Sequence, residues 1–187
     1  TFANDLERVP HSEGVFERER CSAIKTIQLP DGIKSISELS VTALSSLESI
    51  NIPEGVTLIG NYAFSGCSSL KSLTIPSSVT TIEKYAFENC TGKLIVNCNL
   101  PNYTSSQSPF KSNKFTEVYF GNGVTEIGDY TFINSANLNY VHIPEGVTRI
   151  GNCAFVDCYR LTLTLPSTIK EIGNYALCYT VYCKATT

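Results

Sequence analysis

Two adjacent stretches of the sequence determine the fold: residues 47–69 read LESINIPEGVTLIGNYAFSGCSS and residues 70–92 read LKSLTIPSSVTTIEKYAFENCTG. They share a leading Leu, an apolar-x-Ile-Pro core, a Val-Thr-x-Ile segment and a Tyr-Ala-Phe-x-x-Cys segment. A fixed period of 23 residues indicates a repeat architecture, because stacked copies can bury an apolar face that one copy cannot bury alone.

The same offset of 23 relates residues 115–137 to residues 138–160. Weaker copies extend the pattern back to Ile24 and forward from Leu161. The sequence therefore predicts seven units that start near residues 24, 47, 70, 93, 115, 138 and 161.

The unit at 93–114 is irregular. We align Val96 and Cys98 with the two inward strand positions and Phe110 with the aromatic position. Between them lies a polar stretch in which the usual valine and isoleucine are missing.

The predicted division of the chain is a polar N-terminal cap or partial repeat at 1–23, followed by the coils at 24–187 with a truncated C-terminal strand. Eight charged residues within the first 20 suit a cap that shields the first coil from edge pairing. A linker from an upstream domain is the alternative for this segment.

Each unit has a direct physical reading. The alternating Ile-x-Ile core predicts a short strand, and the proline that follows ends pairing because it lacks an N–H. The glycine after the isoleucine of the Val-Thr-x-Ile segment is expected to permit a positive φ, and the Ala-Phe-x-x-Cys spacing suits one helical turn. The strands must be parallel because every coil turns the same way. We predict a repeat solenoid: a right-handed superhelix with a parallel β-sheet and short helical turns.

The ladders of equivalent apolar residues should exclude water. Residues predicted to be buried are Ile24, Ile27, Leu47, Ile50, Phe64, Leu70, Leu73, Phe87, Phe132, Leu138, Val141 and Phe155.

Composition narrows the function classes. The 187 residues are 42% hydrophobic and 17% charged, so the chain should fold, and its net charge of −3 disfavours nucleic-acid binding. No apolar run approaches the roughly 18 residues of a membrane span. Because the chain contains no Met, we expect it to be a piece of a longer product.

A unit of the form L-x-x-I-x-I-P-x-x-V-T-x-I-G-x-x-A-F-x-x-C-x-x-L resembles the BspA-type leucine-rich repeats of bacterial and protozoan surface proteins. The likeness covers about residues 21–183, with Thr131 in place of Ala and Leu177 in place of Phe as departures. It implies a leucine-rich-repeat solenoid, a secreted or cell-surface location and a role in adhesion. It offers no catalytic residue and no cofactor.

The eight cysteines follow the repeat rather than a disulfide pattern. One repeat position holds Cys in several units and Leu or Ser in others, namely Cys21, Leu44, Cys67, Cys90, Ser135 and Cys158. We expect mostly free, buried thiols that act as small hydrophobes. Disulfides between Cys67 and Cys90 or between Cys178 and Cys183 remain alternatives.

We expect no metal site, no cofactor and no catalytic centre. There is no Cys-x-x-Cys, and the closely spaced cysteines have no nearby histidine. A cysteine nucleophile would need an electropositive, partly exposed setting, which the core position does not offer.

The outward strand positions change along the chain. The first outward position lies between the two inward residues of each strand and holds Gln28, Asn51, Thr74, Asn97, Tyr119, His142, Thr164 and, less regularly, Tyr182. The second outward position lies two residues earlier and holds Thr26, Ser49, Ser72, Ile95, Glu117, Tyr140 and Thr162. Small polar residues thus give way to aromatic ones, and Tyr119 and His142 should be direct neighbours. We predict a binding face formed by Glu117, Tyr119, Tyr140 and His142. The alternative is that these are ordinary residues of a half-exposed strand.

The leading hypothesis is a non-enzymatic protein-interaction or adhesion module of a secreted or cell-surface protein. Its expected partner is a protein or glycan, for example in the host matrix or on another cell surface. An intracellular leucine-rich-repeat scaffold is the alternative, since free thiols suit a reducing compartment. An enzyme ranks third.

Overall fold

The chain is a parallel β-solenoid in the computed structural model, which describes residues 23–180 and 182–185. The predicted cap therefore lies outside the described residues, apart from Ala23, and so does Cys21. The strands along the front are β1 (Thr26–Gln28), β3 (Ser49–Asn51), β5 (Ser72–Ile75), β7 (Thr91–Val96), β8 (Lys114–Phe120), β10 (Tyr140–His142), β12 (Thr162–Leu165) and β14 (Tyr182–Ala185). The strands along the back are β2 (Ser35–Ile36), β4 (Leu58–Ile59), β6 (Thr81–Ile82), β9 (Glu126–Ile127), β11 (Arg149–Ile150) and β13 (Glu171–Ile172).

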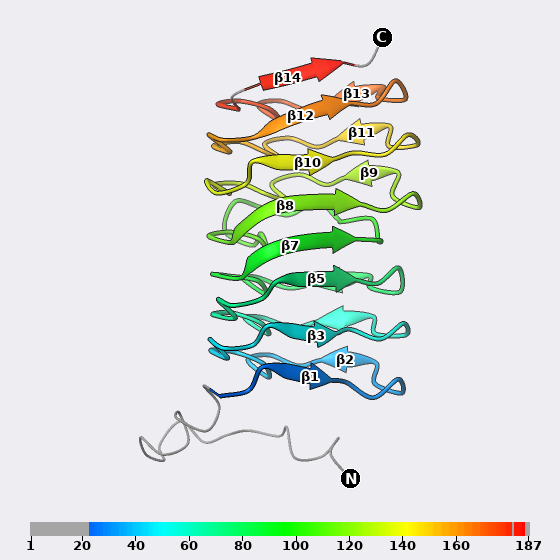
Figure 1. Ribbon diagram of the computed structural model, residues 1–187. Coiled ribbons are helices and arrows are strands. Elements are labelled where there is room, and N and C mark those ends of the chain that lie inside the picture. The colour runs from blue at the N-terminus through cyan, green and yellow to red at the C-terminus, as the bar shows by residue number, and fades with distance from the viewer. Residues whose placement is uncertain (1–22, 181, 186–187) are drawn as a thin grey trace.

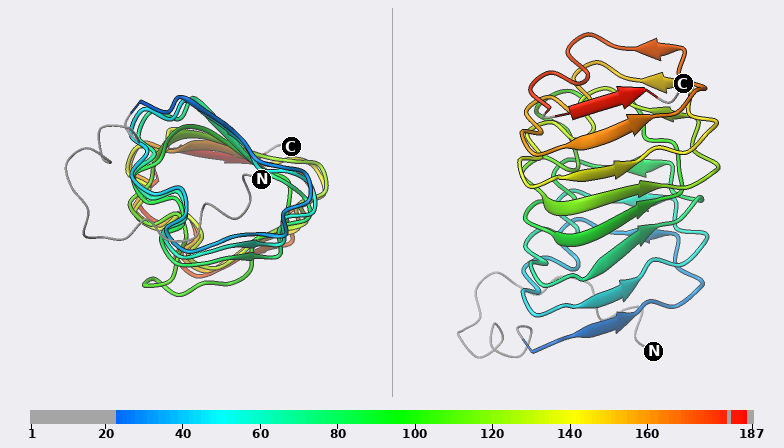
Figure 2. Two further views of the ribbon diagram at one scale, coloured as in Figure 1. Left: turned by 90° about the horizontal axis from the view of Figure 1, so that it is seen from below. Right: turned by 45° about the horizontal axis from the view of Figure 1, so that its top comes forward.

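The solenoid is right-handed, as predicted. In Figure 1 the front strands run from left to right and the back strands from right to left while the chain climbs. Every paired strand is parallel, and equivalent residues face each other, as Ile27 faces Ile50 and Val118 faces Val141. Figure 2 shows the coils stacked over a common interior.

The front strands form the pair β1-β3 and the six-stranded sheet β14-β12-β10-β8-β7-β5, and the back strands form two sheets, β2-β4-β6 and β9-β11-β13. Six coils supply a front and a back strand each, whereas the unit at 93–114 supplies β7 alone to the described strands. The back sheet is therefore interrupted at this unit, where Leu100 makes an isolated bridge to Ile127. The loop between β7 and β8 protrudes from the stack (Figure 2, left).

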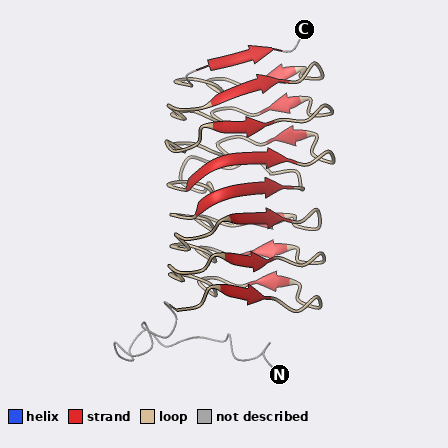
Figure 3. Ribbon diagram, viewed as in Figure 1, coloured by secondary structure: helices blue, strands red, loops and turns tan. Residues whose placement is uncertain are grey.

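The predicted helical turns are wrong: among the described residues the third side of each coil consists of tight turns (Figure 3). Tyr62, Phe64 and Gly66 donate their N–H groups to the next coil, while the intervening residues donate to the carbonyl three residues back. Tyr62 and Gly66 have φ values of 54° and 82°. This alternation ties neighbouring coils together, and its left-handed residues cannot continue a helix.

The core is a continuous set of ladders. The buried rings of Phe64, Phe87, Phe110, Phe132 and Phe155 stack with successive centroid distances of 5.4, 5.2, 4.7 and 5.7 Å. Of the residues predicted to be buried, ten are buried. Ile24 is not, with 36% exposure, and Ile27 is only half-buried, because no described coil lies beneath them.

The role assigned to the repeat glycine is also wrong. Gly60 and Gly173 lack a positive φ; instead, a Cβ on Gly60 would lie 2.7 Å from the backbone nitrogen of Glu38, and one on Gly173 would lie 2.5 Å from that of Asn152. At Gly60 and Gly173 glycine therefore allows a close approach of the adjacent coil, where a Cβ would require the neighbouring backbone to shift.

The alignment of the irregular unit requires correction. Leu94 and Val96 lie opposite Leu73 and Ile75, so the inward strand positions are these two and not Val96 and Cys98. Cys98 is nevertheless buried, and Phe110 occupies the aromatic ladder as expected.

The outward positions shift accordingly. Ile95 lies opposite Thr74 and Tyr119, and Lys93 lies opposite Ser72 and Glu117. Near the C-terminus, Tyr182 pairs with Thr162, so Tyr182 belongs to the earlier outward position.

Within the described residues, Cys67, Cys90, Cys98, Cys153, Cys158 and Cys178 are free. The thiols of Cys67, Cys90 and Cys158 donate to backbone carbonyls of the preceding coil at 3.1, 3.0 and 3.3 Å. Burial raises the pKa of Cys158 to about 12 and that of Cys98 to about 11, so both remain neutral thiols. In the irregular unit, buried Asn113 takes the corresponding place.

Candidate functional site

The residues predicted to bind a partner lie together on the outer side of the front sheet. His142 on β10 is directly opposite Tyr119 on β8, and Tyr140 is opposite Glu117. The expected adjacency is thus confirmed. We call these four residues the aromatic cluster.

The ring of Tyr119 contacts both other rings of the aromatic cluster. The centroid of Tyr119 lies 5.5 Å from that of Tyr140 and 6.1 Å from that of His142, with interplanar angles of 52° and 37°. Such tilted contacts are the favoured aromatic geometry and hold the rings in place. Tyr119 is half-buried, whereas Tyr140 is 41% exposed and His142 is exposed.

Tyr119 is the anchored member. Its hydroxyl donates to Glu117 Oε2 at 3.0 Å, and this hydrogen bond is the main reason why the pKa of Tyr119 is raised. The ammonium group of Lys93 lies 3.7 Å from the centre of the Tyr119 ring. Sequence reasoning missed Lys93 because the shift in register at the irregular unit brings it opposite Glu117.

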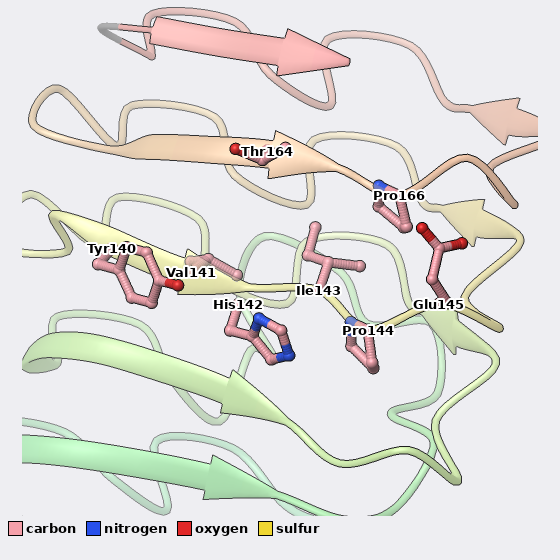
Figure 4. A pocket seen from close by; sticks show the side chains of 8 residues that line it. All are labelled: Tyr140, Val141, His142, Ile143, Pro144, Glu145, Thr164 and Pro166. Atoms are coloured by element: carbon pink, nitrogen blue, oxygen red, sulfur yellow. The ribbon is translucent and has the colours of Figure 1, made fainter. Parts of the chain in front are cut away.

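A shallow hollow of about 250 Å³ adjoins the exposed side of the cluster. Its lining includes Tyr140, His142, Glu145 and Thr164 (Figure 4). Both carboxylate oxygens of Glu145 accept hydrogen bonds from Ser167, one from its N–H at 3.2 Å and one from its hydroxyl at 3.1 Å. The hollow therefore combines an exposed ring with a fixed carboxylate.

A second hollow, of about 330 Å³, lies at the interruption of the back sheet, next to β6. Tyr103 lines it, and within the described chain its buried hydroxyl has no hydrogen-bond partner. The Tyr103 ring packs against the core where the irregular unit lacks a back strand, which explains its burial.

The back sheet carries a polar network that the sequence reasoning did not anticipate. Asp129 Oδ1 accepts hydrogen bonds from Arg149 Nη2 at 2.8 Å and from the N–H of Asn152 at 2.9 Å. Burial raises the pKa of Asp129, but the hydrogen bonds from Asn152 and Arg149 outweigh it and leave this pKa below its ordinary value. Because its groups are bound to one another, the network holds coils together rather than offering a site.

In the part of the chain that the structure describes, no group of three or more His, Cys, Asp or Glu residues is placed to hold a metal ion. The same residues include no helix with the length and hydropathy of a membrane span.

A right-handed coil of parallel strands, filled by Leu, Ile, Val and Phe ladders at a 23-residue period, defines a leucine-rich-repeat protein. The chain belongs more narrowly to the BspA-type leucine-rich repeat family, whose repeat matches residues 12–108 and 103–186 in six copies.

Two solved structures of leucine-rich repeat proteins share the fold. A leucine-rich repeat protein from Bacteroides ovatus is 26% identical with a TM-score of 0.53, over 87% of this chain and 43% of that protein. The leucine-rich repeat protein of T. pallidum is 24% identical with a TM-score of 0.58, over 82% of this chain and 76% of that one. The chain thus spans less than half of the Bacteroides protein. A comparison with curated proteins found no match.

Proposed function

We propose that this chain is a non-enzymatic interaction or adhesion module of a secreted or cell-surface protein, and that it holds its partner on the aromatic cluster. The partner is a protein or a glycan of a matrix or of another cell surface. The family supports the general class, because leucine-rich repeats are interaction scaffolds.

The observation that carries the site assignment is the exposed ring of Tyr140 beside His142 on a rigid sheet. A ring fixed in this way can bury a large area with little loss of conformational entropy on binding. Further along the same face, the side chain of Asn51 is less available to a partner, because its oxygen accepts the N–H of Leu29 at 2.8 Å.

The absence of an enzymatic role is part of the proposal. Burial in the core removes the exposed, electropositive setting that a cysteine nucleophile needs, as the raised pKa values of Cys98 and Cys158 illustrate. The aromatic cluster uses its carboxylate Glu117 to hold Tyr119.

Adhesion to immobilised extracellular matrix tests the proposal. The triple variant Tyr119→Ala, Tyr140→Ala and His142→Ala should bind at least about tenfold more weakly than the parent, which corresponds to the loss of one anchor. The double variant Asn51→Ala and Thr74→Ala is the control from the other half of the face. Full binding by the triple variant, with unchanged melting, would rule out this site.

The alternative, an intracellular scaffold, is favoured by one observation: Cys67, Cys90, Cys98, Cys153, Cys158 and Cys178 are free thiols. Locating the full-length product in its own cells decides between the two. Exclusive recovery from the cytosol would support the scaffold.

A further inference from the structure

We infer that the hollow beside the aromatic cluster binds one neutral sugar ring of a glycan, stacked on Tyr140. The inference rests on the proposed function, since it assigns a partner class to the same face. It uses Tyr140, His142, Glu145 and Thr164, which line the hollow.

The two tyrosines of the cluster differ in what their rings can still contact. Tyr119 is half-buried, and the Lys93 ammonium lies over its ring at 3.7 Å. Tyr140 keeps 41% of its surface exposed and borders the hollow. The apolar C–H face of a pyranose packs on such a ring, as other apolar groups do. Tyr140 is therefore the platform, and Tyr119 supports it from the side.

The polar groups around the platform suit a hydroxylated ligand. No described residue forms a side-chain hydrogen bond with the Tyr140 hydroxyl, the His142 ring or the Thr164 hydroxyl, whereas Ser167 fixes the Glu145 carboxylate. A hydroxyl can both donate and accept, so the hydroxyls of a sugar stacked on Tyr140 can pair with the imidazole of His142 and the hydroxyl of Thr164, which lie on the paired strands β10 and β12. A ligand without such groups would leave them unpaired.

Charge favours a neutral ligand over a basic or an acidic one. Glu117 and Glu145 oppose an acidic group. Both carboxylates already accept hydrogen bonds, and the Lys93 ammonium opposes a second cation nearby.

The hollow of about 250 Å³ is smaller than the roughly 300–1,000 Å³ of drug-sized sites, so a single ring is the expected occupant.

Affinity electrophoresis tests the inference with named probes. Gels would contain mannan, galactan, dextran or mixed-linkage β-glucan as neutral polysaccharides, and heparin or polygalacturonate as anionic ones. At least one neutral polysaccharide should retard the chain. Tyr140→Ala should weaken this binding about tenfold, as expected for the loss of a stacked ring.

Matched controls come from the same sheet. Thr164→Val should weaken retardation, whereas Thr74→Val, an exposed threonine at the equivalent position of β5, should not. Tyr175→Ala removes an equally large ring that is 72% exposed elsewhere and should also have no effect.

Three results would overturn the inference: no retardation by any neutral polysaccharide, retardation that survives Tyr140→Ala, or a preference for the anionic probes. Enzymatically deglycosylated matrix separates it from the proposed function. If cluster variants lose adhesion to native and deglycosylated matrix alike, the interaction face stands and the sugar assignment fails. If adhesion never depends on the cluster, both fail.

Discussion

The two halves of the front face share one backbone ladder but use their outward side chains differently. On β1, β3 and β5 these side chains are small or polar, and Asn51 is bound within the protein because its side-chain oxygen accepts the N–H of Leu29. On β8 and β10 they are aromatic and partly exposed. The inward positions hardly change, because each ladder must continue without gaps. The outward positions are free of that constraint, so binding chemistry can vary there without altering the fold.

The largest expected loss of stability follows a substitution at the junction of the two halves, in the irregular unit at 93–114. Phe110 is fully buried and stacked between Phe87 and Phe132, so Phe110→Ala should cost about 3–5 kcal/mol. Since each coil contacts only its neighbours, the halves should then unfold in separate steps, with a broadened urea transition measured by circular dichroism.

Leu177→Ala is the control, since Leu177 is half-buried near the C-terminal end of the described coils. It should cost about 1 kcal/mol, because little apolar surface is lost, and leave a single sharp transition. Equal effects of the two substitutions would show that the junction has no special role.

A smaller effect is expected at Asn113, the polar residue that interrupts the cysteine ladder. Its side chain donates to Phe110 O and to Ser135 Oγ, the latter at 2.7 Å, and accepts the N–H of Phe115 at 2.9 Å. Asn113→Ala leaves these buried groups unpaired and should cost about 1–3 kcal/mol in urea unfolding.

Ser135→Ala and the double variant complete the cycle for this site. Because Asn113 and Ser135 are bonded, the double variant should cost less than the two single costs added together. Strict additivity would contradict the bond.

Much of the fold follows from the 23-residue period. Equal spacing predicts that Phe64 stacks on Phe87 and that Tyr119 lies beside His142, and the structure shows both contacts. The register of β7 could not be read in the same way. Leu94, Val96 and Cys98 are all apolar, so two alignments satisfy the pattern. Pairing with the neighbouring coil decides between them.

The place of Lys93 opposite Glu117 depends on this alignment of β7, and so does the contact of its ammonium group with the Tyr119 ring. The glycine and helix predictions failed for a related reason. A sequence shows local conformational preference, whereas Gly60 and the Tyr62 turn are determined by the adjacent coil. The hollow beside Tyr140 could not be foreseen because it lies between coils.

The ion pairs of the two halves should differ in strength and share one pH dependence. Asp129→Asn should cost about 1 kcal/mol near pH 7, in the upper range for partly exposed pairs, and Glu48→Gln should cost less because Glu48 is more exposed. Both carboxyls have pKa values below their ordinary ones, Glu48 because of its hydrogen bond with Lys71.

A lowered pKa in the folded state means that the ionised carboxylate stabilises the fold at pH values above the unfolded pKa of the carboxyl group, which is about 4. That stabilisation is lost as the pH falls through the folded value. Urea unfolding of parent and variant should therefore converge below about pH 4. A difference for Asp129→Asn that grows towards low pH would contradict the sign.

The smallest expected effect is at Lys93, where Lys93→Ser gives β7 the residue that β5 carries at Ser72. Removing an ammonium from the Tyr119 ring should cost about 0.5–1 kcal/mol, the value of a partly exposed cation–π contact. Tyr119→Leu would remove the ring together with its bond to Glu117, so only a double-mutant cycle isolates the lysine contribution. A coupling energy near zero would show that Lys93 merely lies over the ring.

Because Tyr140 and the hollow remain, Lys93→Ser should leave retardation by neutral polysaccharide unchanged. A large loss of retardation would place the sugar on Tyr119 instead of Tyr140.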